Sequence, residues 1–363
     1  MTKPRARDLG IPFQGTPGPC NAITDVGGVT VGHNTLISGE GRLVVGKGPV
    51  RTGVTAIRPR GNALAPVFGA WSSLNGCGDM TGTIWLEESG VLLGPVMLTN
   101  TLSVGVVREA VILWMIEQYK IPFALPIVTE TYDGYLSDIR GSHVTQEHAI
   151  SALLNATGGP VAEGNVGGGT GMICHGFKGG IGTASRRLET GQGGYTVGVL
   201  VQANNGRRRN LLVGGIPVGE HFTDLMPLDG KIEDQPMGSS IIVIIATDCS
   251  LLPHQLRRLA QRASLGIGRV GGMGENYSGD IFLAFSTASF GEAKEDGIRA
   301  VEMYPNEKMD ALFEATAWAT EEAIINTMVA AETMVGINGN TVYALPHERI
   351  QEVLMKYNRL ASA

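Results

Sequence analysis

The 363-residue sequence lacks long apolar runs. Its strongest runs, VILWMI and IIVIIA, end after six residues, far short of the roughly 18 that a membrane-spanning helix needs. The first residues carry positive charge, but no apolar segment of about 7–15 residues follows them, so no secretory signal is indicated. We therefore expect a soluble, cytoplasmic protein.

Basic residues are not in excess. The chain has 28 lysines and arginines against 34 aspartates and glutamates, for a formal net charge of -6. Proteins that bind nucleic acids or anionic membranes gain affinity from clustered Lys and Arg, so we expect neither partner. The one basic run, residues 207–209, is interpreted as a solvated turn beside the Asn-Asn-Gly at 204–206.

Patterns for metal, disulfide and nucleotide sites are also missing. The four cysteines form no CxxC pair, and the seven histidines form no HExxH or similar ligand pair. The glycine-rich stretch GNVGGGTG at 164–171 is not followed by the GK[ST] of a phosphate-binding loop. We expect neither a metal nor any other cofactor.

Glycine is abundant instead. The 52 glycines are about twice the usual share of roughly 7%, and they lie in short clusters between apolar runs. This distribution is typical of tight turns, and of backbone that closely approaches other backbone or a ligand.

Strand and helix patterns occur in blocks. Alternating residues predict strands at 21–37 (broken at Gly27 and Gly28), 51–60, 123–131, 193–206, 241–248 and 280–287. Helical spacing predicts helices at 104–119, at 145–156 capped by Thr145, at 253–263 begun by Ser250 or Asp248, at 309–334 as a long amphipathic helix, and at 346–360. Residues 216–239 are interpreted as an exposed connection. This grouping favours an α+β layered sandwich over a doubly wound parallel sheet.

Two serines, Ser239 and Ser240, stand between the polar connection and the apolar run 241–246. A cut just before Ser240 would create an amino-terminal serine. Its α-amine, with a reference pKa of about 7.7–8.0, could act as general base for its own hydroxyl. The serine could make the cut itself by attacking the preceding carbonyl in an N-to-O acyl shift. Serines are also common where a strand follows a turn, and the pattern alone favours that simpler interpretation.

Several longer motifs occur in a defined order: NAITDV, ETYDG, EGNVGGGTGM, VQANNG, SIIVIIATD and NYSGDIFLAFST. With them, nearly the whole chain resembles the self-processing L-aminopeptidase/D-amidase/D-esterase and β-aminopeptidase family. The resemblance implies an αββα four-layer sandwich like that of amino-terminal nucleophile hydrolases, with different connectivity. It also implies a single domain that cleaves itself into an α subunit, 1–239, and a β subunit, 240–363, and that forms a homotetramer of αβ units.

By motif, the family's nucleophile falls on Ser240. Family members commonly have Gly or Asn before the nucleophile, whereas here Gly238 precedes two serines, so a cut before Ser239 is the alternative. We prefer Ser240 because the match from there to NYSGD has no gap, and because a one-residue slip along a strand reverses the facing of the side chain.

Four further residues are implied by the same resemblance. Ser278 and Asp280 match the pair that assists the nucleophile, with the carboxylate holding the ammonium or relaying its proton. Asn204 and Tyr132 match positions that hydrogen-bond the substrate or the developing oxyanion. Taken without the resemblance, Asp280 is interpreted as a loop cap and Asn204 as part of a turn.

The resemblance implies an aminopeptidase that hydrolyses small peptides, amino-acid amides or esters with a free amine, including β-peptides or derivatives of D-residues. Two alternatives stay open. One is an acyltransferase or amide-oligomer hydrolase that uses the same acyl-enzyme, and the other is a non-catalytic small-molecule binding protein.

Overall fold

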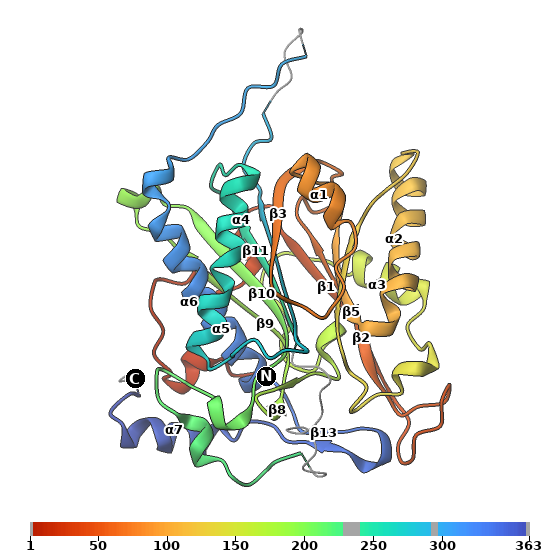
Figure 1. Cartoon of the computed structure of the whole chain (residues 1–363), viewed down its shortest axis with the longest axis vertical. Coiled ribbons are helices and arrows are strands. Elements are labelled where there is room, and N and C mark those ends of the chain that lie inside the picture. The colour runs from red at the N-terminus through yellow and green to blue at the C-terminus, as the bar shows by residue number, and fades with distance from the viewer. Residues whose placement is uncertain (1–2, 228–239, 292–296, 361–363) are drawn as a thin grey trace.

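The computed structural model describes residues 3–227, 240–291 and 297–360, and two stacked sheets form its centre (Figure 1). The first sheet has the strand order β1 (Thr30–Ser38), β2 (Val50–Arg58), β5 (Val96–Asn100) and β6 (Ile127–Thr131). The second has the order β4 (Val91–Leu92), β3 (Val67–Gly76), β12 (Gly279–Ser286), β11 (Ser240–Thr247), β10 (Thr196–Asn204) and β9 (Gly180–Arg187). Two short hairpins are added: β7 (Ile173–Cys174) with β8 (Phe177–Lys178), and β13 (Met334–Val335) with β14 (Thr341–Val342).

Helices cover the outer face of each sheet. In Figure 1, α2 (Val104–Tyr119) and α3 (Gln146–Leu154) lie on one side, and α4 (Pro253–Gln261), α5 (Ala263–Arg269) and α6 (Asp310–Val329) lie on the other. Two further α-helices of the described residues are α1 (Thr83–Ser89) and α7 (His347–Lys356). One apolar core lies between the two sheets. A second core lies between the six-stranded sheet and its helices, and a third lies between the four-stranded sheet and its helices. These four layers confirm the predicted αββα sandwich.

Both sheets are mostly antiparallel, with one parallel pair each. Strand β5 is parallel to β6, and α2 connects them, while β11 is parallel to β12, and α4 and α5 connect them. Parallel neighbours need such a crossover. The pairing explains why the helical blocks in the sequence separate strands that lie side by side.

Strand β11 is buried on both faces. Its even-numbered residues Ile242 and Ile244 belong to the core between the sheets, and its odd-numbered residues Ile241 and Val243 belong to the core under the helices. Successive side chains of a strand point to opposite faces. Ser240, the first residue of the strand, therefore faces the layer between the two sheets.

The predicted helix starts are right in one case and wrong in another. Helix α3 begins after Thr145 as expected. Helix α4 is capped by Leu252, whose N–H donates to the Gln255 side chain at 3.1 Å, and not by Ser250 or Asp248. The Asp248 carboxylate instead accepts the N–H of Thr196 on the neighbouring strand. A tertiary contact thus replaces the local cap that the sequence suggests.

The long carboxyl helix is shorter and more buried than predicted. It ends at Val329 rather than Met334, and 16 of its 20 residues are buried, so the predicted amphipathic character is wrong. Strands β9 and β10 of the six-stranded sheet, α5 and the amino-terminal segment all pack against it. The last helix is also shorter than the expected 346–360, because α7 ends at Lys356.

The predicted strand at 21–37 starts late. Residues Ile23–Asp25 form a 3-10 turn, and β1 begins only at Thr30. The Asp25 carboxylate accepts the N–H groups of Cys20 and Ala22, at 2.9 and 3.0 Å. These local hydrogen bonds compete with strand pairing, as short acidic side chains often do.

Two surface interpretations are wrong. Arg208, in the run taken as a solvated turn, is buried; its guanidinium lies 3.3 Å from the centroid of the Phe177 ring and donates to the His175 carbonyl at 2.9 Å. The described part of the connection at 216–239 is also not fully exposed, because Phe222 is buried edge-to-face against Phe177. The rest of that connection, 228–239, lies outside the described residues.

A buried ionic cluster ties the amino-terminal segment to α6. The Glu322 carboxylate accepts hydrogen bonds from Arg7 at 2.9 Å, Arg186 at 2.7 Å and Asn21 at 2.6 Å. Burial alone would raise the pKa of Glu322, but Arg186 and Arg7 hold that pKa below its ordinary value. Glu322 is therefore ionised, and its charge is balanced by Arg186 and Arg7.

We expect Glu322→Ala to lower the free energy of unfolding by about 3–5 kcal/mol, because it leaves the buried guanidinium of Arg186 and the partly exposed one of Arg7 without their counter-charge. Urea unfolding measures the change. The control is Arg257→Ala, which removes an exposed pair with Glu87 and should cost no more than about 1 kcal/mol. Equal effects of the two substitutions would contradict this account of the cluster.

Within the described ranges, every helix is too short or too polar to span a bilayer. All four cysteines are free thiols, and Cys174 and Cys249 are buried. Burial raises the pKa of each of these two thiols to about 12.

Candidate active site

Ser240 lies at the amino end of β11 and is 5% exposed. Its Oγ accepts the N–H of Gly279, the first residue of β12, at 3.0 Å. On the other side of β11, Asn204 at the end of β10 is its direct cross-strand partner. The hydroxyl is thus fixed between two strand ends. Ser239 and the proposed cut lie outside the described residues.

Ser278 and Asp280 flank the glycine that contacts Ser240. The Ser278 hydroxyl donates to Asp280 Oδ1 at 2.5 Å, and both residues are buried. Residue 280 is paired with Ile241 in the parallel register, next to Ser240. The structure therefore brings the three residues together at the amino ends of the parallel strands β11 and β12.

Asp280 has a raised pKa. Burial moves the pKa of its carboxyl to about 6, while hydrogen bonds from Ser278 and Asn75 act in the opposite direction. A carboxyl in this range is ionised at neutral pH and gains a proton in mild acid. It can hold a nearby ammonium group or exchange a proton with it.

The Asn204 carboxamide is held at both ends. Its Oδ1 accepts the N–H of Ile173 at 2.8 Å, and its Nδ2 donates to the carbonyl of Tyr132 at 3.0 Å. Like Ser240, Asn204 has an even number in a strand whose even-numbered residues, such as Leu200, face the core between the sheets. The amide is therefore oriented on the same side as the serine hydroxyl.

Tyr132 follows β6 and is half-buried. Its carbonyl contacts Asn204, and burial raises the pKa of its phenol, with the nearby Asp133 adding to the effect. A side chain at Gly134 would collide with the Tyr132 hydroxyl, so glycine at this position lets the Tyr132 ring pack against the main chain. The two predicted substrate-binding residues, Tyr132 and Asn204, are in direct contact.

Glu130 is a further candidate that the sequence analysis did not single out. Its carboxylate accepts the Asp79 N–H at 3.0 Å and the Thr101 hydroxyl, and it is 4% exposed. A Cβ at Gly78 would lie 3.2 Å from both Glu130 Oε1 and the Cα of Gly279, so Glu130 lies close to the residue whose N–H binds Ser240. Burial raises its pKa. In the sequence, the signal that could have identified Glu130 is its place in the ETYDG motif, two residues before Tyr132.

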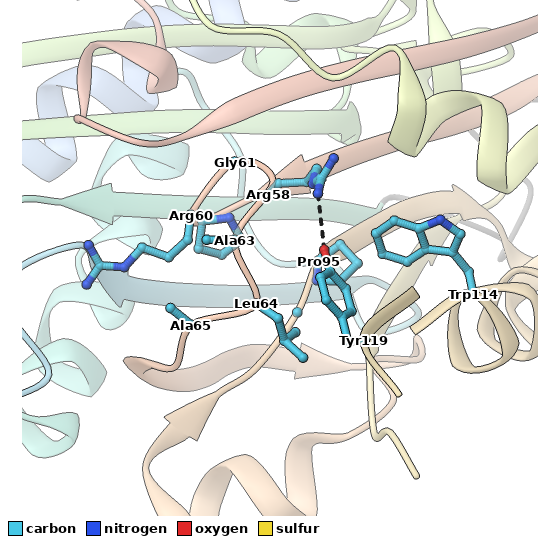
Figure 2. A pocket seen from close by; sticks show the side chains of 11 residues that line it. Arg58, Arg60, Gly61, Ala63, Leu64, Ala65, Pro95, Trp114 and Tyr119 are labelled. Carbon is cyan, nitrogen blue, oxygen red and sulfur yellow. Dashed lines mark hydrogen bonds between the residues drawn. The ribbon is translucent and has the colours of Figure 1, made fainter. Parts of the chain in front are cut away.

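A pocket elsewhere on the protein does not belong to this site. Figure 2 shows this pocket between residues 58–65 and α2, where Arg58 donates to the Tyr119 hydroxyl at 3.3 Å. None of the five predicted site residues lines this pocket. Among the described residues, no three His, Cys, Asp or Glu side chains are grouped as a metal site.

Known proteins that are similar to this chain identify its family. The model of peptidase family S58 matches residues 21–342. The beta-peptidyl aminopeptidase BapA of Sphingosinicella microcystinivorans is 55% identical, over 99% of this chain and 94% of that protein.

Solved structures of similar proteins share the fold. The L-aminopeptidase D-Ala-esterase/amidase of Ochrobactrum anthropi, described as a prototype of the serine aminopeptidases with a variant of the Ntn hydrolase fold, has a TM-score of 0.91 at 48% identity, covering 99% of this chain and 100% of that one. A Burkholderia sp. beta-aminopeptidase has a TM-score of 0.87 at 49% identity, covering 97% and 99%. From this match over almost its whole length, the chain is a serine-type aminopeptidase that belongs to peptidase family S58.

Proposed function

We propose that the chain cleaves itself before Ser240 into fragments 1–239 and 240–363, and that the new amino-terminal serine is the nucleophile of the aminopeptidase. The observation that carries this proposal is the placement of Ser240. Its hydroxyl lies at the end of a buried strand, accepts a main-chain N–H, and has Asn204 on one neighbouring strand and Asp280 beside the other. A rigid element can hold a reacting group to the tolerance that catalysis requires.

In the proposed reaction, Ser240 Oγ attacks the carbonyl that follows the substrate's amino-terminal residue, and the hydroxyl proton passes to the free α-amine of Ser240. Asn204 Nδ2 stabilises the oxyanion of the tetrahedral intermediate. The α-ammonium returns the proton to the leaving amine as the C–N bond breaks. Water then attacks the resulting ester, which releases the acyl group and restores the serine hydroxyl.

Asp280 supports the amine in this scheme. Its ionised carboxylate holds the ammonium form that appears during the attack, and Ser278 fixes the carboxylate through their 2.5 Å hydrogen bond. The same residues serve the initial cut. Ser240 Oγ attacks the carbonyl before it, and the C–N bond breaks as the Ser240 nitrogen takes up the hydroxyl proton. Water then hydrolyses the resulting ester, which separates the two fragments and leaves the α-amine of Ser240 free.

Glu130 defines the substrate class. Its buried carboxylate uses two protein donors and can accept further hydrogen bonds, which suits the free ammonium of a substrate. We propose small peptides, amides and esters with a free amine as substrates. Peptides of β-amino acids are included because a 55% identical relative is a beta-peptidyl aminopeptidase.

We also propose that αβ units assemble into a homotetramer. Large exposed apolar side chains, including Ile84 at 84% and Phe123 at 67% exposure, support a contact with further subunits. Light scattering of the cleaved protein measures the assembly: four times the 38.3 kDa of one chain supports the tetramer, and a single αβ unit contradicts it.

The proposed acyl-enzyme can be trapped. Acid quenching during turnover of a slowly hydrolysed amino-acid ester should leave the acyl mass on fragment 240–363, and peptide mapping should place it on the first serine. A label on any other residue, or a burst of product without a labelled fragment, would contradict the assignment of the nucleophile. Added amine acceptors in the same assay would show whether the acyl group is also transferred.

The proposal predicts a characteristic pH profile. Below about pH 6 the Asp280 carboxyl gains a proton, as its raised pKa indicates, and the neutral acid no longer holds the ammonium. As the pH decreases, kcat/KM should therefore fall more steeply below about pH 6 than above it. The Ser278 hydrogen bond lowers this pKa, so Ser278→Ala should move the steeper part to higher pH. An unchanged profile in cleaved Ser278→Ala enzyme would contradict the role of the pair.

A further inference from the structure

Lys178 is a fully buried lysine that takes no part in the proposed reaction. It ends β8, and its Nζ donates to three main-chain carbonyls: Met172 at 2.8 Å, Gly179 at 2.9 Å and Gly169 at 3.4 Å. All three carbonyls belong to the glycine-rich segment at 169–179. An ammonium group has three donors, so the lysine uses each of them to fix this turn.

One of these carbonyls leads directly to Asn204. The C=O of Met172 and the N–H of Ile173 belong to a single peptide group, which is planar and rigid. The carbonyl end accepts Lys178 Nζ, and also the N–H of Gly179 at 2.9 Å. The N–H end donates to Asn204 Oδ1 at 2.8 Å. Lys178 Nζ and the Gly179 N–H together therefore fix the direction of the N–H that holds the amide.

The second partner of Asn204, the carbonyl of Tyr132, lies beside Asp133, whose charge is opposite in sign to that of Lys178. Asn204 Nδ2 donates to the carbonyl of Tyr132, and the next residue, Asp133, is 1% exposed and packs against Gly171 of the same segment. Burial lowers the pKa of Lys178 to about 7, and the Asp133 carboxylate opposes that shift. Burial raises the pKa of Asp133 to about 7. A buried cation and a buried acid thus stand next to the two main-chain groups that orient the amide.

We infer that Lys178 is a positioning residue for catalysis: through the Met172–Ile173 peptide group it fixes and polarises the Asn204 carboxamide. This inference rests on the oxyanion role proposed for Asn204. Hydrogen bonds in a chain strengthen one another in a low-dielectric interior. The chain of hydrogen bonds from Lys178 Nζ through the Met172–Ile173 peptide group to Asn204 orients Nδ2 and makes it a stronger donor than it would be without these hydrogen bonds.

Lys178→Met is the main test, because it keeps an unbranched side chain and removes all three donors. We expect kcat per mole of cleaved chain to fall about 10- to 100-fold, which is less than the roughly 10²- to 10³-fold loss for removing an oxyanion donor itself. KM should change less than about 3-fold, since the substrate carbonyl gains charge only in the transition state. Lys178→Gln, which keeps an amide donor, should retain more activity.

Arg51→Met is the matched control. Arg51 is also a buried cation that donates to main-chain carbonyls, those of Val335 and Ser38 at 2.8 Å each, but none of these carbonyls belongs to a peptide group that contacts Asn204. We expect Arg51→Met to lower stability and to leave kcat per mole of cleaved chain within about 2-fold. A loss of kcat as large as that of Lys178→Met would overturn the specific role of Lys178.

A double-mutant cycle with Asn204→Ala separates this inference from the proposed function. Once the amide is gone, Lys178→Met should reduce kcat by less than about 3-fold further. A full, independent loss in that background would overturn the positioning role and leave that of Asn204 intact. If Asn204→Ala alone keeps the parental kcat, the proposed oxyanion role itself is wrong. Where a variant stays uncut, the rate of self-cleavage takes the place of kcat, and where Lys178→Met does not fold, Lys178→Gln takes its place in the cycle.

Discussion

Ser240→Ala is expected to leave a full-length, inactive chain. The substitution removes the only oxygen that can attack the preceding carbonyl in the proposed acyl shift, so no amino-terminal nucleophile is formed. It keeps the strand, because alanine fits a position that is buried between β10 and β12. Denaturing electrophoresis should show one band near 38.3 kDa, and aminoacyl anilide turnover should fall to the background rate.

Ser239→Ala is the matched control for that result. It changes the neighbouring hydroxyl and leaves Ser240 in place, so the chain should still be cut and active. If Ser239→Ala stays uncut while Ser240→Ala matures, the nucleophile is Ser239. If both variants mature, neither serine performs the cut and the self-processing proposal is wrong.

Glu130→Ala is expected to give the second large effect. In the proposal, its buried carboxylate pairs with the ammonium of the substrate. Truncating one partner of a buried, hydrogen-bonded charge pair costs about 2–5 kcal/mol, so kcat/KM for a free-amine substrate should fall roughly 30- to 5,000-fold. The preference for a free amine over an N-acetylated analogue should fall with it. Steady-state kinetics on the two substrates measure both changes.

Glu109→Gln provides the control for Glu130→Ala. Glu109 lies on α2, where its exposed carboxylate accepts a hydrogen bond from Gln146, so its neutralisation should leave both substrates unaffected. A Glu130→Ala enzyme that matures normally and keeps its preference for free amines would contradict the proposed ammonium site.

The sequence predicts six strands of the two central sheets and five of the α-helices, because these follow strong local patterns. It does not single out β3, β4, β5 or β9. The run 241–248 and helix 104–119 appear in the structure almost as expected, as β11 and α2. The misplaced ends have tertiary causes. Asp248 pairs with Thr196 instead of capping α4, and α6 is covered on several sides by segments distant in sequence. Patterns within a short window carry no information about such partners.

The site is only partly predictable for the same reason. Ser278 and Asp280 lie close together in sequence, and the family motifs point to them and to Ser240. The contact between Ser240 and Gly279 depends on the parallel register of β11 and β12, and no local pattern specifies that register. For Glu130 the sequence offers only its place in the ETYDG motif. A role for Lys178 can be inferred only once the hydrogen-bond partners of its buried amine are known.

Intact mass measurement of the purified chain, followed by sequencing of its new terminus, tests the central claim most directly. The account predicts two fragments of about 25 and 13 kDa, in proportion to the 38.3 kDa chain, with the smaller one beginning at Ser240. A single uncut chain with full aminopeptidase activity would contradict it.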